Sequence, residues 1–134
     1  MIVLNWIMFG NGKTQDGQGN TTYKAKYVGG HKMFPKSRNV EVTLLSEEIK
    51  VSGIDFDITY STITNVENVD EKKIELKRIV LLGIAGALWK KKHLYTVIDY
   101  VDELDQKQSV LFDFAKNIEE VQQLIYNKTL NNKK

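Results

Sequence analysis

The hydrophobic pattern of this chain changes its period once, near residue 117, and that change constrains the fold more than any other feature. Before it, apolar and polar residues alternate in short runs, a pattern that is typical of strands with one buried face. After it, the apolar residues recur with helical spacing and share one face: Ile118, Val121, Leu124 and Ile125. The sequence therefore predicts a mainly β fold of antiparallel strands with one C-terminal α-helix, which ends near Leu130.

Six runs carry the strand pattern, at residues 23–28, 40–45, 49–51, 56–60, 94–101 and 110–115. The run that starts at Phe56 is expected to continue through Ile63 and Val66 as one strand. An acidic turn at residues 102–105 joins the last two strands. Asn117, followed three residues later by Glu120, predicts a capping box at the start of the helix.

Antiparallel strands followed by one helix bury all of their apolar faces if the sheet curls and the helix plugs its open end. Four stretches of this chain resemble small bacterial pleckstrin-homology-like (PH-like) domain proteins: Tyr27-Val28-Gly29-Gly30-His31, residues 40–51, residues 58–63 and Phe112-Asp113-Phe114. The resemblance covers residues 27–126 and implies a PH-like antiparallel β-barrel capped by the helix. Another small β-barrel or sandwich capped by a helix is the alternative fold.

The length of 134 residues and a composition close to that of globular proteins predict one folded domain. Residues 1–22 are set apart as an apolar arm followed by a flexible polar linker, since residues 10–22 are rich in Gly, Asn, Gln, Asp and Thr. The arm has three interpretations: an edge strand, a partner-binding arm, or untranslated sequence ahead of a start at Met8. The PH-like domain is assigned to residues 23–130 and a tail to residues 131–134.

Composition disfavours several functional classes. The chain has no cysteine, which excludes disulfides, thiolate catalysis and cysteine-ligated zinc and fits a reducing, cytoplasmic location. Residues 1–9 lack the basic region and cleavage site of a signal peptide, so secretion is not expected. A net charge of +2 is too small to indicate nucleic-acid binding, and we expect no nucleic-acid partner.

No enzyme motif is complete in this sequence. Residues 10–14 end like a phosphate-binding loop, but Ile7 stands where that motif needs its first glycine. His31 and His93 lack the spacing of a zinc site and are expected at the surface. No serine lies in a nucleophile elbow. We therefore expect no catalytic residues, no metal and no cofactor.

The most unusual stretch is residues 79–89, eleven mostly apolar residues between Lys77-Arg78 and three lysines. It is too short to span a membrane, which needs about 20 apolar residues. One interpretation is a buried strand or short core helix, in which the lysines are solvated ends. The other is an exposed patch that docks on another subunit or on an anionic membrane. The second interpretation assigns binding to Leu82, Leu88, Trp89, Lys90, Lys91 and Lys92.

A second basic group, Lys32, Lys36 and Arg38, lies in the loop expected between the first two strands. Its spacing resembles the loop with which eukaryotic PH domains bind phosphoinositides. The resemblance implies phosphate contacts through charge-assisted hydrogen bonds, with the arginine as a fork. A solvated turn is the alternative interpretation, because basic loops are common.

Together these features predict a non-catalytic interaction module that binds a protein partner or assembles into a homo-oligomer. The resemblance favours the same function, since some bacterial PH-like proteins are similar to ring-forming homo-oligomers. Exposed strand edges and the apolar stretch offer surfaces for either kind of contact. The alternative is peripheral association with an anionic membrane surface through basic and aromatic residues. We expect a cytoplasmic protein, placed at the membrane periphery under the alternative.

Overall fold

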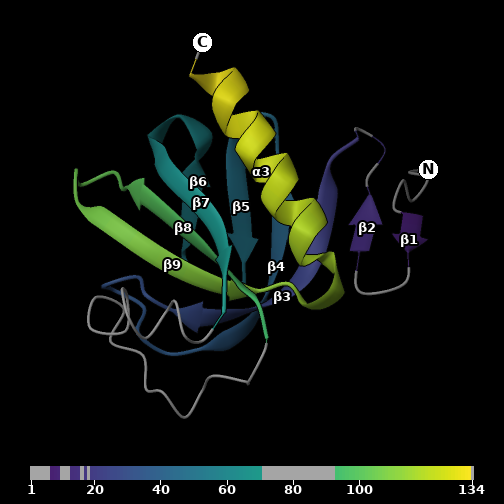
Figure 1. The fold of residues 1–134 in the computed structure, drawn as a ribbon, viewed down its shortest axis with the longest axis horizontal. Coiled ribbons are helices and arrows are strands. Elements are labelled where there is room, and N and C mark those ends of the chain that lie inside the picture. The colour runs from purple at the N-terminus through teal and green to yellow at the C-terminus, as the bar shows by residue number, and fades with distance from the viewer. Residues whose placement is uncertain (1–6, 10–12, 16, 18, 71–92, 134) are drawn as a thin grey trace, which may run out of the picture.

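One antiparallel sheet, curled around a C-terminal helix, accounts for most of the described chain (Figure 1). The computed structural model describes residues 7–9, 13–15, 17, 19–70 and 93–133. The elements in chain order are β1 (Ile7–Phe9), β2 (Lys13–Gln15), β3 (Thr21–Gly29), β4 (Arg38–Leu44), β5 (Glu48–Ser52), β6 (Phe56–Thr59), the 3-10 turn η1 (Tyr60–Thr62), β7 (Ile63–Val69), β8 (Tyr95–Val101), β9 (Lys107–Asp113), the 3-10 turn η3 (Ala115–Asn117) and α3 (Ile118–Asn132). The predicted class, mainly antiparallel β with a C-terminal α-helix, is confirmed.

The strand order is β6-β5-β4-β3-β9-β8-β7, and each neighbouring pair runs antiparallel. Outside this path, β2 pairs with the start of β3, and β1 pairs with β2. β3 joins the two halves of the sheet, since it pairs with β4 along residues 21–27 and with β9 from Lys26 onward. Among the described strands, the edges β6 and β7 do not pair with each other. The predicted barrel is therefore a curled sheet rather than a closed one.

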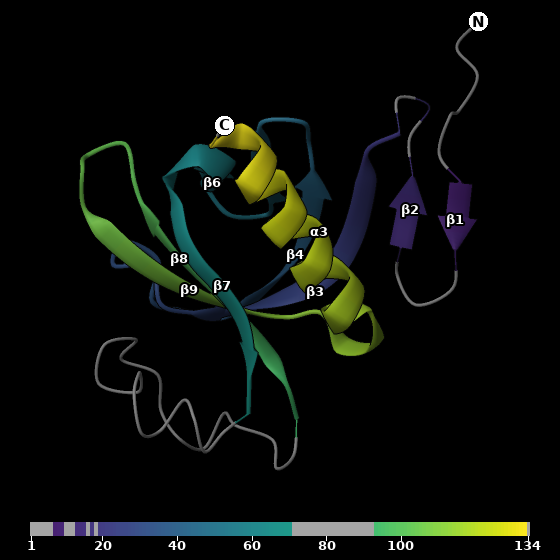
Figure 2. The same ribbon diagram turned by 45° about the horizontal axis from the view of Figure 1, so that its top comes forward.

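The main core fills the concave side of the curled sheet, under α3 (Figure 2). Phe112 from β9 is fully buried, and its ring centroid lies 5.7 Å from that of Tyr27 and 5.6 Å from that of Phe114. Helical spacing places the buried apolar residues of α3 on one face: Ile118, Val121 and Ile125. The remaining buried members of this core are Tyr23, Val40, Val42, Leu44, Ile49, Val51, Ile58, Tyr60, Ile63, Val66, Ile98, Tyr100 and Val110.

The opposite, convex side of the sheet carries a second and smaller apolar cluster. Its members are Val28, Val69, Tyr95, Val97 and Leu111. Successive residues of a strand point to opposite faces, so Val97 and Ile98 on β8 lie on opposite sides of the sheet. Both side chains are fully buried. β8 is therefore buried on both faces, whereas β4 alternates between buried and exposed residues along most of its length.

The prediction of a single strand from Phe56 to Val66 is wrong. Residues Tyr60–Thr62 form a 3-10 turn, in which the Tyr60 hydroxyl donates to the Leu45 carbonyl (2.8 Å). The buried ring of Tyr60 keeps the chain against the core at this point while the backbone changes direction. As a result, β6 and β7 lie at opposite edges of the sheet.

Part of the stretch expected to be a flexible linker forms strands. Lys13–Gln15 is β2, and β3 already begins at Thr21. Both pair through their backbones, in the register Lys13 with Tyr23 and Gln15 with Thr21. Polar composition therefore did not prevent strand formation here, because main-chain pairing does not depend on apolar side chains.

The predicted capping box at the start of α3 does not form. The side chain of Asn117 makes no capping hydrogen bond to the helix. Glu120 instead forms an ion pair with Lys13 (2.6 Å) and accepts a hydrogen bond from the Tyr23 hydroxyl (2.5 Å). Glu120 thus bonds to residues distant in sequence rather than to the start of its own helix. These bonds connect α3 to β2 and β3.

Replacing Phe112 with alanine should remove a fully buried ring from the main core and leave a cavity. We expect the free energy of unfolding, measured by urea denaturation, to fall by about 3–5 kcal/mol. Leu104→Ala, at a side chain that is 75% exposed, is the matched control and should change this value by less than about 0.5 kcal/mol. A loss below about 1 kcal/mol for Phe112→Ala would contradict the assigned core.

Candidate functional site

Three of the predicted binding residues lie close together in sequence, at the junction of two strands. Lys32 and Lys36 lie in the loop between β3 and β4, and Arg38 is the first residue of β4. All three residues are exposed. The remaining predicted binding residues lie outside the described residues: Leu82, Leu88, Trp89, Lys90, Lys91 and Lys92. The conformation and exposure of residues 79–89 therefore stay predictions.

The loop between β3 and β4 is held by the hydroxyl of Tyr27, whose ring belongs to the core. This hydroxyl accepts a hydrogen bond from the His31 N–H (2.9 Å) and donates one to the Phe34 carbonyl (2.5 Å). The backbone also closes on itself, since the Phe34 N–H donates to the His31 carbonyl (3.0 Å). The Met33 N–H donates to Nδ1 of His31 (3.0 Å). Hydrogen bonds thus define the conformation of this loop from His31 to Phe34.

His31 is buried, so the prediction that it lies at the surface is wrong. Its imidazole stacks on the ring of Phe56, with centroids 4.8 Å apart, and lies 5.1 Å from the ring of Phe34. Burial lowers the pKa of His31 below the usual 6.5, while the negative charge of Asp102 opposes this shift. The neutral ring is also the form that accepts from Met33. Burial and hydrogen bonding therefore favour the same protonation state.

The hairpin tip between β8 and β9 is organised by the carboxylate of Asp102. Its Oδ1 accepts from the N–H groups of Leu104 and Gln106 (both 2.9 Å), and its Oδ2 accepts from Nε2 of Gln108 (2.8 Å). The bond from Gln108 is the largest of the effects that lower the pKa of Asp102, and the bond from Gln106 follows. Asp105 takes a left-handed conformation (φ 63°), which aspartate tolerates in tight turns.

One buried side chain, Gln108, joins these two loops. Its Oε1 accepts from the Lys32 N–H (3.0 Å), and its Nε2 donates to Asp102. Both ends of the amide are therefore used, one for each loop. We name residues 31–36 and 102–106 together the two-loop tip.

The two-loop tip presents both apolar and charged groups to solvent. Met33 is 72% exposed and Leu104 is 75% exposed, one on each loop. Residues 31–36 carry two lysines and are followed by Arg38, whereas residues 102–106 carry three carboxylates. The loops that bear the two exposed apolar side chains thus carry charges of both signs.

The sequence predicted the basic residues of this site and the acidic turn, but not the hydrogen bonds that order the two loops. A signal existed for Asp102, because aspartate in turns often accepts from backbone N–H groups two residues further on. Leu104 was also visible as a single apolar residue among polar turn residues, and Met33 as part of the apolar pair Met33-Phe34 in a polar loop. The bond between Gln108 and Lys32 joins residues 76 positions apart, and no local pattern indicates it.

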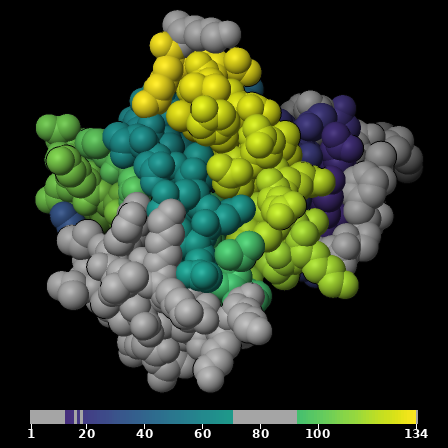
Figure 3. All heavy atoms as spheres, in the orientation of Figure 1, coloured from purple at the N-terminus to yellow at the C-terminus, as the bar shows by residue number. Residues whose placement is uncertain are grey.

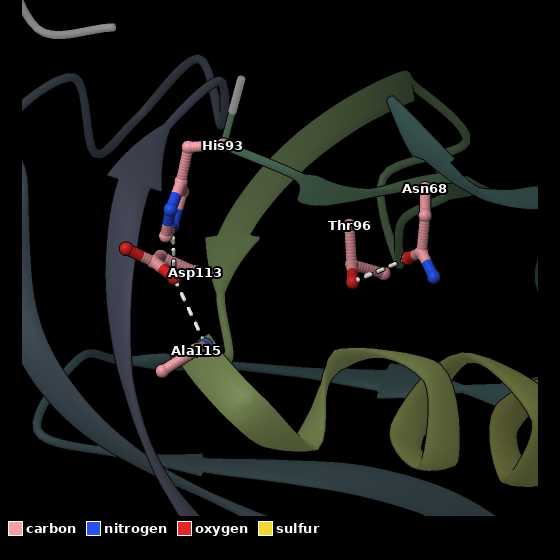
Figure 4. Close-up of polar contacts among 5 residues, drawn as sticks. All are labelled: Asn68, His93, Thr96, Asp113 and Ala115. Atoms are coloured by element: carbon pink, nitrogen blue, oxygen red, sulfur yellow. Dashed lines mark hydrogen bonds and ion pairs between the residues drawn. The ribbon is translucent and has the colours of Figure 1, made fainter. Parts of the chain in front are cut away.

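A second polar cluster supports the turn into the helix (Figure 4). Oδ1 of Asp113 accepts from the Ala115 N–H (2.9 Å) and pairs with Nε2 of His93 (2.8 Å). This contact holds Ala115 at a positive φ of 52°, which is strained for alanine. In the same view, Thr96 donates to Asn68 across β8 and β7 (2.8 Å). Among the described residues, His93 bonds to no hydroxyl, so the pair with Asp113 lacks the nucleophile of a hydrolytic triad.

Within the described ranges, no group of three or more histidine or acidic residues is placed to hold a metal ion. A hollow of about 630 Å³ lies against β3 and β4, lined by Lys24, Ala25, Lys26, Asn39, Val40, Glu41, Ser52, Gly53, Asp113 and Ala115. Its two lysines are balanced by two carboxylates, so it favours neither cationic nor anionic ligands.

Comparison with protein-family models, curated proteins and solved structures finds no match to this chain. In the part of the chain that the structure describes, no helix has the length and apolar character needed to cross a membrane. The interpretation of the two-loop tip therefore rests on its geometry and chemistry.

The burial of His31 predicts how its ring titrates. We expect an NMR titration of the imidazole to give a pKa below 6.5, because the buried ring loses solvation when it is protonated. Asp102→Asn removes a negative charge that favours the protonated ring, so this change should lower the pKa of His31 further.

This titration also has a consequence for stability. Because the pKa of His31 is lower in the folded chain than in the unfolded chain, the unfolded state binds the proton more readily. The contribution of His31 to stability is therefore complete above pH 6.5 and is lost as the pH falls below that value. A measured pKa of His31 at or above 6.5 would contradict its buried placement.

Proposed function

We propose that this chain is a non-catalytic interaction module that binds a protein partner, or a second copy of itself, through the two-loop tip. The observation that carries the proposal is the pair of exposed apolar side chains, Met33 and Leu104, on loops whose backbones are held by hydrogen bonds. Single exposed apolar residues are common, but these two lie on loops that Gln108 joins. An ordered loop loses little conformational freedom on binding, which favours affinity.

The charges of the two-loop tip support a protein partner over a lipid surface. Each lysine or arginine near an anionic membrane contributes about 1 kcal/mol of attraction. The three carboxylates of residues 102–105 offset most of the attraction of the four nearby cations, Lys32, Lys36, Arg38 and Lys107. A protein surface with patches of both signs fits this mixture better than a uniformly anionic membrane does.

Membership of the PH-like group is part of the proposal. Seven strands in one curled antiparallel path, followed by a helix over the core, support it. The membrane alternative places its contacts at Trp89 and residues 90–92 together with the basic loop. Of these, the loop between β3 and β4 lies within the described residues.

The double change Met33→Ser with Leu104→Ser tests the proposal, because it removes both apolar groups and leaves the backbone hydrogen bonds of the loops in place. We expect the wild type to form a defined oligomer at tens of micromolar, or to capture a specific protein from a lysate of its source cells. Light scattering and mass spectrometry of the captured proteins measure the two cases. The double variant should weaken the contact by about tenfold or more.

A matched control replaces an exposed apolar residue outside both loops, Leu94→Ser, and should leave this contact intact. Binding of the wild type to anionic vesicles that weakens with added salt would favour the membrane alternative. The assignment of partner binding to the two-loop tip is contradicted if the wild type is monomeric and captures the same proteins as the Met33→Ser, Leu104→Ser variant.

A further inference from the structure

The edge strand β7 has one side free of strand pairing in the described chain. It pairs with β8 along its other side, and no further described strand pairs with it. Figure 3 shows β7, in teal, at the surface beside α3, in yellow. The Val66 carbonyl accepts from Nε2 of Gln122 on α3 (3.3 Å). The helix therefore lies against this edge at Val66 and bonds to the carbonyl of that residue.

A groove with a volume of about 170 Å³ lies between this edge and α3. It is lined by four consecutive residues of β7 and by the C-terminal part of the helix: Ile63, Thr64, Asn65, Val66, Tyr126, Thr129, Leu130 and Lys133. Sites for small molecules and cofactors usually measure about 300–1,000 Å³. The groove is too small for such a ligand, but it has room for individual side chains.

The groove contains a buried hydroxyl that lacks a partner. Thr129 is 8% exposed, and its Oγ1 has no hydrogen-bond partner among the described residues. Native proteins pair nearly all of their buried polar groups, because an unpaired group loses its bonds to water without replacement. A ligand that brings a polar group to the Thr129 hydroxyl would therefore replace the lost bond.

The helix side of the groove also offers apolar and charged contacts. Tyr126 is 46% exposed and Leu130 is 47% exposed. Lys133 adds a positive charge at the end of the helix. Together with Thr129, these residues have the spacing that places side chains on one helical face.

We propose that this groove binds an extended peptide segment of a partner protein, which adds as a strand to the free edge of β7. Strand addition uses backbone groups of residues 63–65 on this edge, and alternate side chains of the peptide enter the groove. An apolar side chain lies between Tyr126 and Leu130, and an acidic side chain lies near Lys133. The proposal rests on the proposed function as an interaction module, and it names the class of partner as an extended peptide. It uses no residue of the two-loop tip.

An extended peptide fits this groove better than a helix or a lipid surface does. The backbone groups of a helix are paired within the helix, so a helical partner has none to offer the edge of β7. A single lysine gives little attraction to an anionic membrane. Free edges of sheets, in contrast, are where proteins accept an additional strand.

A phage-displayed library of random heptapeptides, panned against the intact chain, supplies the probe. We expect the enriched peptides to alternate apolar and polar residues and to carry an acidic residue. Each synthesised peptide should shift the backbone NMR signals of residues 63–66 and 126–133. The signals of residues 31–36 should stay unchanged.

Thr129→Val separates peptide binding from stability, because valine has a similar shape and lacks the hydroxyl. The affinity for a selected peptide should fall about three- to tenfold, the loss expected for one hydrogen bond. The melting temperature of the free chain should stay the same or rise, since a buried unpaired hydroxyl is removed. Tyr126→Ala with Leu130→Ala should weaken peptide binding by about tenfold or more.

The Met33→Ser, Leu104→Ser variant is the matched control and should bind the peptides within about twofold of the wild type. If the library enriches no peptide, the groove proposal is overturned. It is overturned equally if the peptides bind the Tyr126→Ala, Leu130→Ala variant as tightly as the wild type. Either result leaves the proposal for the two-loop tip standing, because that proposal is tested by the tip variant in the lysate and light-scattering measurements.

Discussion

The fold depends on one topological constraint: β6 and β7 are consecutive strands of the chain, yet they form opposite edges of the sheet. In a flat sheet, seven strands spaced about 4.8 Å apart would separate these edges by about 29 Å. The turn Tyr60–Thr62 lets the chain advance by at most about 14 Å between Thr59 and Ile63. The sheet must therefore curl until its edges approach each other, and the curl creates the concave side that α3 covers.

Three buried tyrosines connect that core to the segments around it. The Tyr23 hydroxyl donates to a carboxylate on α3. The Tyr27 hydroxyl donates to a carbonyl in the loop before β4, and the Tyr60 hydroxyl donates to a carbonyl in the turn between β4 and β5. Burial raises the pKa of Tyr27 to about 12 and also raises the pKa of Tyr23 and of Tyr60. All three stay protonated donors at neutral pH. The same side chains thus fill the core and determine where the helix and the loops lie.

The sequence predicted the strands and the helix because burial of one face repeats with a fixed period. It did not predict the turn at Tyr60, because the apolar alternation from Phe56 continues through that residue while the backbone changes direction. It also missed β2, whose pairing with β3 is made by backbone groups that hydrophobic patterns do not record. The sequence predicted the basic loop and the acidic turn of the two-loop tip separately, but not the contact between them, since Gln108 bonds to the first loop across 76 positions of sequence.

The two proposed binding surfaces differ in how their polar groups are satisfied. In the two-loop tip, both carboxylate oxygens of Asp102 and both ends of the Gln108 amide have partners. Such a network orders the loops before any partner arrives, so its binding depends on shape and on the exposed apolar side chains. In the groove beside β7, the Thr129 hydroxyl has no partner among the described residues. The Tyr100 hydroxyl also has no partner there; Tyr100 belongs to the main core and lines a different hollow, whereas Thr129 lines the groove beside the side of β7 that no described strand pairs with. Both hydroxyls are shielded from solvent, but a peptide bound in the groove lies next to Thr129. Under the groove proposal, binding therefore offers the Thr129 hydroxyl a partner and removes an energetic penalty that the folded chain retains.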